Sequence, residues 1–143
     1  MTLEELQHEA RQDLAVIDQE RLDQESLKNQ TIKAKWLEHR TKYDQLLIMS
    51  KTNHQRKWRQ KWEYYGGKAD AKVYAAKPFD IKVLKTDLQM YIQSDDDILE
   101  LQSKISYYES IVKYIDGVIK SIDNRGWDIK NAITWKQFEA GMV

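Results

Sequence analysis

The chain has 143 residues, 23 acidic and 23 basic side chains, and no cysteine. A net charge of zero argues against a uniformly basic nucleic-acid binder, and the lack of cysteine excludes disulfides, zinc fingers and thiolate chemistry. The length suits one domain. One Pro and five Gly are too few turn-forming residues for a β-rich fold, so we expect an all-α protein.

The chain shows no signal for export or for a membrane. No stretch approaches the roughly 20 apolar residues that a membrane span requires. Residues 1–14 alternate acidic and apolar side chains, which is not the pattern of a secretion signal. The sequence therefore predicts a soluble, intracellular protein.

Charge is distributed unevenly along the chain. Residues 1–25 contain eight acids and two arginines, whereas residues 51–72 contain seven cations and two acids. This uneven distribution of charge suits a protein with one surface that attracts polyanions and another that repels them.

The first predicted helix begins at a capping box formed by Thr2 and Glu5, and its apolar spacing continues to about Ile17. A second, much longer helix is predicted over residues 20–65, which no Gly or Pro interrupts. Gly66 and Gly67 then end it, since glycine tolerates the left-handed conformation of a helix C-terminus.

The segment 68–79 has poor periodicity and contains Pro78, so it is interpreted as a loop or as a short β element around residues 72–74. A further helix is predicted over about residues 80–91. Ser94 then has the character of an N-cap, and the acids at 95–97 suit the first turn of the next helix.

A long C-terminal helix carries an apolar seam with the strict three-four spacing of a coiled coil. The face is too broad for a small chain to cover alone, so we expect part of it to be buried by other subunits. A break is predicted at residues 124–126, with a last helix beyond it. The predicted oligomerisation residues are Ile98, Leu101, Ile105, Tyr108, Val112, Ile115, Ile119, Ile122, Trp127 and Phe138.

Cations and aromatic residues interleave at the end of the second helix, in what we call the basic-aromatic strip. Cations neutralise phosphates and release counterions, while aromatic faces stack on unpaired bases, so this composition is typical of a surface that binds single-stranded DNA. The alternative is that the tryptophans belong to the core and the cations form a solvated face. The strip consists of Arg56, Lys57, Trp58, Arg59, Lys61, Trp62, Tyr64, Tyr65 and Lys68.

No enzyme signature is found. The run at 66–68 (GGK) lacks the spacing of a phosphate-binding loop, and no nucleophile elbow is present. His8, His39 and His54 are scattered without a second ligand at helical spacing, and acids at 95–97 point in three directions on a helix. We therefore expect neither catalysis, nor a metal, nor a cofactor.

Several segments, in order along nearly the whole chain, resemble the UvsY family of recombination mediators of large tailed phages. They are residues 3–7 (LEELQ) with Asp13 and 17–18 (ID), 35–37 (KWL), 61–67 (KWEYYGG), 125–130 (RGWDIK) and 138–141 (FEAG).

The resemblance implies a homo-oligomeric ring, a hexamer or heptamer, assembled through the C-terminal region. It also implies binding to single-stranded DNA, to a phage recombinase of the UvsX type and to the phage single-strand binding protein, in the cytoplasm of an infected bacterium. A Lys-x-Arg pair that contributes to DNA binding in the family matches Arg59 and Lys61, with the two identities exchanged. Lysine and arginine hold phosphate differently, so charge carries over and detailed geometry does not. Trp62 stands where the family has an aliphatic residue.

The leading hypothesis is thus a mediator built as one helical domain. Residues 1–67 form its N-terminal helices with the DNA-binding strip, 68–79 a loop, and 80–143 the oligomerisation helices. The alternative is a structural coiled-coil scaffold or assembly protein that does not bind DNA.

Overall fold

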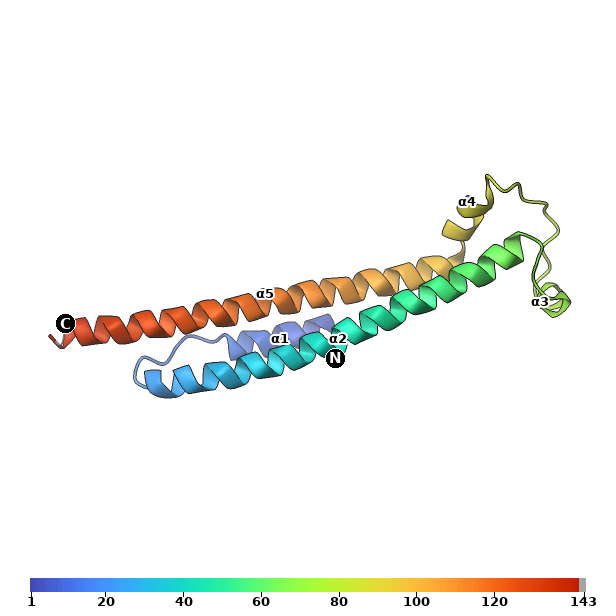
Figure 1. Cartoon of the computed structure of the whole chain (residues 1–143). Helices are drawn as coiled ribbons and strands as arrows, with labels where there is room; N and C mark the ends of the chain where they lie inside the picture. Colours follow the sequence, from blue (N-terminus) through green and yellow to red (C-terminus); the bar gives the residue numbers. More distant parts are fainter. Residues whose placement is uncertain (142–143) are drawn as a thin grey trace. The chain divides into compact units, whose positions relative to one another are not determined.

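A computed structural model describes residues 1–141, and all the regular structure in that range is helical (Figure 1). The predicted all-α class is confirmed. The helices are α1 (Leu3–Asp13), α2 (Leu22–Tyr65), α3 (Ala71–Ala76), α4 (Leu88–Gln93) and α5 (Asp96–Glu139). Over the described range, no helix has both the length and the apolar character needed to cross a bilayer.

The chain forms two compact units, of which the first combines two segments that are distant in sequence and the second is one continuous stretch. Unit 1 contains Met1–Asp44 and the chain from Ser110 onward, and unit 2 contains Gln45–Glu109. The unit boundaries fall inside α2 and α5, whereas the boundaries predicted from the sequence follow changes in secondary structure.

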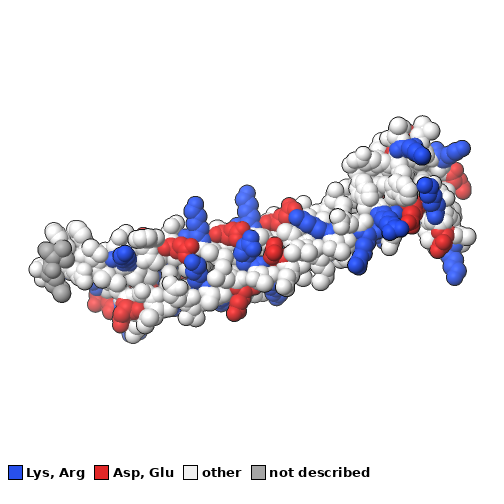
Figure 2. All heavy atoms as spheres, viewed as in Figure 1, with Lys and Arg blue, Asp and Glu red and all other residues white. Residues whose placement is uncertain are grey.

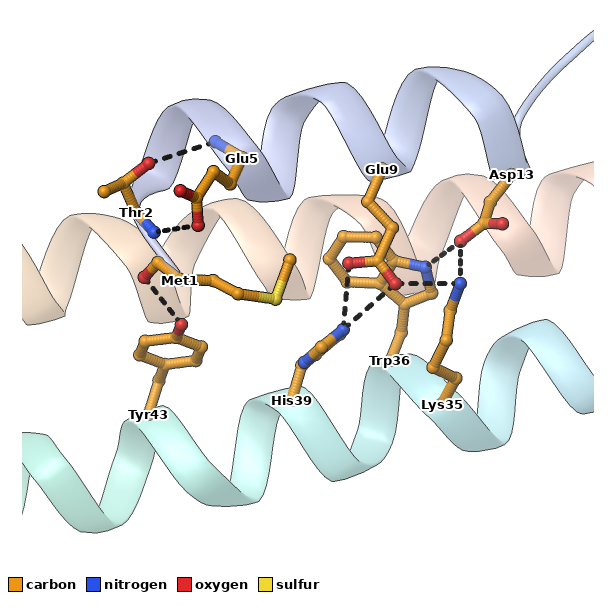
Figure 3. Close-up of polar contacts among 9 residues, drawn as sticks. All are labelled: Met1, Thr2, Glu5, Glu9, Asp13, Lys35, Trp36, His39 and Tyr43. Carbon is orange, nitrogen blue, oxygen red and sulfur yellow. Dashed lines mark hydrogen bonds and ion pairs between the residues drawn. The ribbon is translucent and has the colours of Figure 1, made fainter.

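In unit 1, α1 begins at the predicted capping box, which Figure 3 shows in detail. The Glu5 amide donates to the Thr2 hydroxyl (3.2 Å), and the Thr2 amide donates to the Glu5 carboxylate (3.0 Å). The Tyr43 hydroxyl of α2 donates to the Met1 carbonyl (2.8 Å), which fixes the start of α1 against α2.

The first helix ends at Asp13, so its predicted extension to Ile17 is wrong. The Asp18 carboxylate accepts from the Glu20 amide (3.0 Å) and forms a turn that leads into α2. Because the chain must reverse between two packed helices, residues 14–21 form the connection even though the apolar spacing continues.

Trp36 is the central packing residue between α2 and α1. Its side chain is fully buried, and its indole N–H donates to the Asp13 carboxylate (2.9 Å). Lys35 bridges Asp13 (2.5 Å) and Glu9 (2.9 Å), and His39 contacts Glu9 from the other side (3.2 Å; Figure 3). Two carboxylates of α1 are therefore held by side chains from successive turns of α2.

The contacts of Glu9 in this network predict how the stability of the protein depends on pH. Burial alone would raise the pKa of Glu9, but the hydrogen bonds and charges of Lys35 and His39 outweigh it and hold the pKa below 4.5. A lowered pKa in the folded state means that the stabilisation is present above pH 4.5 and is lost as the pH falls through the folded value. We therefore expect the free energy of unfolding of Glu9→Gln to be about 1 kcal/mol lower than that of the natural protein at pH 7. Between pH 5 and pH 3 it should fall less steeply with pH than that of the natural protein. Denaturant titrations across this range test it, and parallel stability-pH curves for both proteins would contradict it.

The last helix of unit 1 runs without interruption to Glu139, so the predicted break at residues 124–126 is wrong. Arg125 is buried and donates to the Glu25 carboxylate and the Ala15 carbonyl. Asn29 of α2 donates to the Ile122 carbonyl (3.0 Å), and a Cβ at Gly126 would lie 3.4 Å from the Asn29 amide nitrogen. The helix therefore continues through Gly126 beside Asn29, despite the low helix propensity of glycine.

Part of the predicted oligomerisation seam is covered by the chain itself, and the expectation that other subunits bury another part stays a prediction. Ile98, Ile115 and Ile122 expose no surface. Trp127 and Phe138 are well exposed, and the remaining predicted residues are half-buried.

The segment that leads from α2 to α4 corrects two expectations in unit 2. The possible β element near 68–79 is wrong, because residues 71–76 form α3, which the Tyr74 hydroxyl ties to the Tyr64 carbonyl (2.7 Å). The helix predicted over 80–91 is limited to Leu88–Gln93. Ile81 and Leu84 remain exposed, so no apolar face is buried that would stabilise an earlier helical start.

The start of α5 also differs from the prediction. Ser94 is the C-cap of α4, and its hydroxyl donates to the Met90 carbonyl (2.8 Å). Asp95 provides the cap instead, because its carboxylate accepts from the amides of Asp97 (2.9 Å) and Ile98 (3.4 Å).

Candidate nucleic-acid interface

The basic-aromatic strip occupies the last turns of α2 and the glycine break, and all of it lies in unit 2. Gly66 and Gly67 end the helix as predicted. Gly67 has a φ of 74°, and the Lys68 amide donates back to the Glu63 carbonyl (2.8 Å). This return places the Lys68 ammonium 4.6 Å from the centroid of the Trp62 ring.

Arg56, Arg59, Trp62 and Lys68 are the exposed members of the strip. Arg59 pairs with Glu63 one turn later (3.3 Å), but the guanidinium side chain is 83% exposed. Such a solvated pair is worth little, so Arg59 can exchange its carboxylate partner for a phosphate at small cost.

Lys61 has a different environment, because it is buried between two acids from the start of α5. Its ammonium lies 3.2 Å from the Asp95 carboxylate and 2.9 Å from that of Asp97. Burial alone would lower the pKa of Lys61, but hydrogen bonds to Asp97 and Asp95 outweigh burial and raise it. Lys57 reaches the same Asp97 at 3.9 Å and is half-buried.

The two tyrosines of the strip contact other residues of unit 2 and do not present free ring faces to a ligand. Tyr64 is buried, stacks on Tyr74 with ring centroids 5.4 Å apart, and donates its hydroxyl to the Lys77 carbonyl (3.0 Å). Tyr65 donates to Asp95 (2.5 Å), and burial together with this acceptor raises its pKa. Trp58 is half-buried beside His54.

The structure therefore divides the predicted DNA-binding residues into exposed and structural groups. Sequence reasoning assigned Asp95 and Asp97 only to helix capping and missed their pairing with Lys61. The one available signal was the charge complementarity between residues 51–72 and the acids at 95–97.

Cations also gather beyond the strip. Among the charged side chains that Figure 2 displays over α3, α4 and the chain next to them, Lys and Arg predominate. Two hollows border the strip, and Lys77 and Lys104, which the sequence analysis did not select, line one each.

For residues 1–141, no three His, Asp or Glu side chains gather into a group that could hold a metal ion. His39 belongs to the α1–α2 network, and His54 packs against Trp58.

Comparisons with known proteins agree on one family. The family model described as "Recombination, repair and ssDNA binding protein UvsY" matches residues 9–142. The recombination protein UvsY of Enterobacteria phage T4 is 24% identical over 141 residues, which cover 99% of each chain. Two crystal structures of the T4 recombination mediator protein UvsY share the fold. In lattice type II the TM-score is 0.86 at 24% identity over 98% of each chain, and in lattice type I it is 0.84 at 22% identity over 94% of this chain and 98% of that one.

Proposed function

The chain belongs to the UvsY family of recombination, repair and single-stranded DNA binding proteins, and from that premise we propose that it is a recombination mediator. In this proposal it binds single-stranded DNA through the exposed part of the basic-aromatic strip. It then promotes loading of a phage recombinase of the UvsX type onto DNA coated by the phage single-strand binding protein.

The observation that carries the proposal is the exposed set of Arg56, Arg59 and Lys68 around the Trp62 ring. Three exposed cations can release counterions from three phosphates, and the ring of the exposed Trp62 side chain can stack on an unpaired base at about 1–3 kcal/mol. A stacking contact requires an unpaired base, so this surface favours single strands over duplex.

We further propose that subunits assemble into a ring of six or seven through α5 and the C-terminal aromatic residues. Trp127, Trp135 and Phe138 are each about 60% exposed, an amount of apolar surface that a partner subunit would cover. Repetition of a weak strip around a ring raises the overall affinity for one strand without tight binding by any subunit.

The test is recombinase loading in the presence of single-strand binding protein. The variant Arg56→Ala/Arg59→Ala/Lys68→Ala removes the three exposed cations, and Arg11→Ala/Arg21→Ala/Lys28→Ala removes three exposed cations of unit 1 outside α5 as a matched control. The natural protein and the control should both shorten the lag of the recombinase's DNA-dependent ATPase. At moderate salt, the strip variant should need an about tenfold higher concentration to shorten the lag by the same amount.

Equal activity of the strip variant and the control would contradict the proposed role of the strip. Absence of any effect by the natural protein, together with no retention of single-stranded DNA, would favour the alternative of a coiled-coil scaffold.

A further inference from the structure

Two hollows in unit 2 meet beside the strip. The first lies between α2 and α5 and has a volume of about 710 Å³, and the second lies between the end of α2 and α3 and has a volume of about 480 Å³. Lys57 and Gln60 line both, so the two hollows are neighbours, and together we call them the groove. Volumes of this size accommodate part of an organic ligand and exceed what a single ion needs.

One face of each helix forms the first hollow. Asn53, Arg56, Lys57 and Gln60 follow one another at helical spacing on α2, and residues 97, 100, 101 and 104 do the same on α5. Such a groove runs along both helices, and therefore suits an extended ligand better than a compact one.

The charges that line the groove favour a polyanion. Among residues 1–141, no acidic side chain pairs with Arg56, Lys77 or Lys104. The Lys68 ammonium has no acidic partner in that range either and lies over the Trp62 ring. Two of the four acids that line the groove are already paired within the protein, Asp97 with Lys61 and Glu63 with Arg59. Cations spread along a groove match phosphates spaced along a strand.

We propose that this groove is the path of single-stranded DNA across each subunit, with Lys104 and Lys77 as phosphate contacts at its two ends. The path extends the proposed function and rests on it. Gln60 lies where the two hollows join, and its amide can donate to a phosphate or pair with a base edge as the strand passes.

The test compares two double variants that lose the same charge. Lys77→Ala/Lys104→Ala removes the end contacts, whereas Lys28→Ala/Lys42→Ala removes exposed lysines of unit 1 that line neither hollow. In fluorescence anisotropy with a labelled oligothymidine, the first variant should bind about tenfold more weakly near 0.1 M salt. For this variant, the slope of log affinity against log salt should be less negative by about 1.4 for each subunit that contacts the strand, since each single-strand phosphate contact contributes about 0.7 to the slope. The second variant should bind as the natural protein does.

The outcomes separate this proposal from the proposed function. If Lys77→Ala/Lys104→Ala binds normally while the strip variant does not, the groove path is wrong and the proposed function stands. If both double variants lose affinity equally, net charge explains the effect and the path is again overturned. If neither the double variants nor the strip variant changes binding, both proposals fail.

Discussion

Trp36→Ala is expected to lower the free energy of unfolding by about 3–5 kcal/mol, the range typical of truncating a fully buried tryptophan. The indole is completely buried between α2 and α1, and its N–H donates to Asp13. Truncation leaves a cavity that the flanking helices cannot close without disturbing the Lys35 bridge to Asp13 and Glu9. Urea denaturation followed by circular dichroism, at fixed protein concentration because assembly contributes to apparent stability, measures the loss.

Two variants serve as controls for Trp36. Leu37→Ala alters the next residue, whose side chain is 46% exposed, and should change stability by less than about 0.5 kcal/mol. Trp36→Phe keeps most of the buried volume and should cost about 1–2 kcal/mol for the lost hydrogen bond. A loss for Trp36→Ala no larger than that for Leu37→Ala would show that α1 does not pack on this residue.

Lys61→Ala is expected to destabilise unit 2 by about 2–3 kcal/mol, because it leaves the carboxylate of Asp95 buried without its cation. Asp97 is half exposed, so water solvates it after the substitution and limits the total cost. Any loss of DNA binding by this variant should therefore accompany a loss of folded structure. Thermal unfolding and anisotropy measured on the same samples detect the two effects together.

Arg59→Ala provides the contrast, because Arg59 is the other cation of the pair that matches the family. Its side chain is exposed, so stability should remain within about 0.5 kcal/mol while DNA affinity falls. If Lys61→Ala were as stable as Arg59→Ala and bound DNA equally poorly, the two cations would play the same role, and the buried ion pairs would have no structural importance.

The features that could be predicted from the sequence are those encoded within a few residues. Thr2 and Glu5 cap α1 as expected, Gly66 and Gly67 end α2, and the uninterrupted apolar spacing predicts two long helices. The exposed cations of the strip were also identified, since interleaved charge is a local pattern.

The features that could not be predicted depend on contacts between distant segments. Gly126 lies inside the continuous α5 and beside Asn29, which is 97 positions earlier in the chain. Lys61 is buried because the start of α5 brings two acids to it, and no local signal distinguishes it from Arg59. The same holds for Ile115 and Ile122, whose seam is typical of subunit contacts but is covered within the chain.

The salt dependence of single-stranded DNA binding tests the central claim most directly. For the natural protein, log affinity should fall linearly with log salt, and removal of Arg56, Arg59 and Lys68 should flatten that line by about 2 for each engaged subunit. Identical slopes for the two proteins, or no binding by the natural protein even at low ionic strength, would contradict a DNA-binding role for these exposed cations.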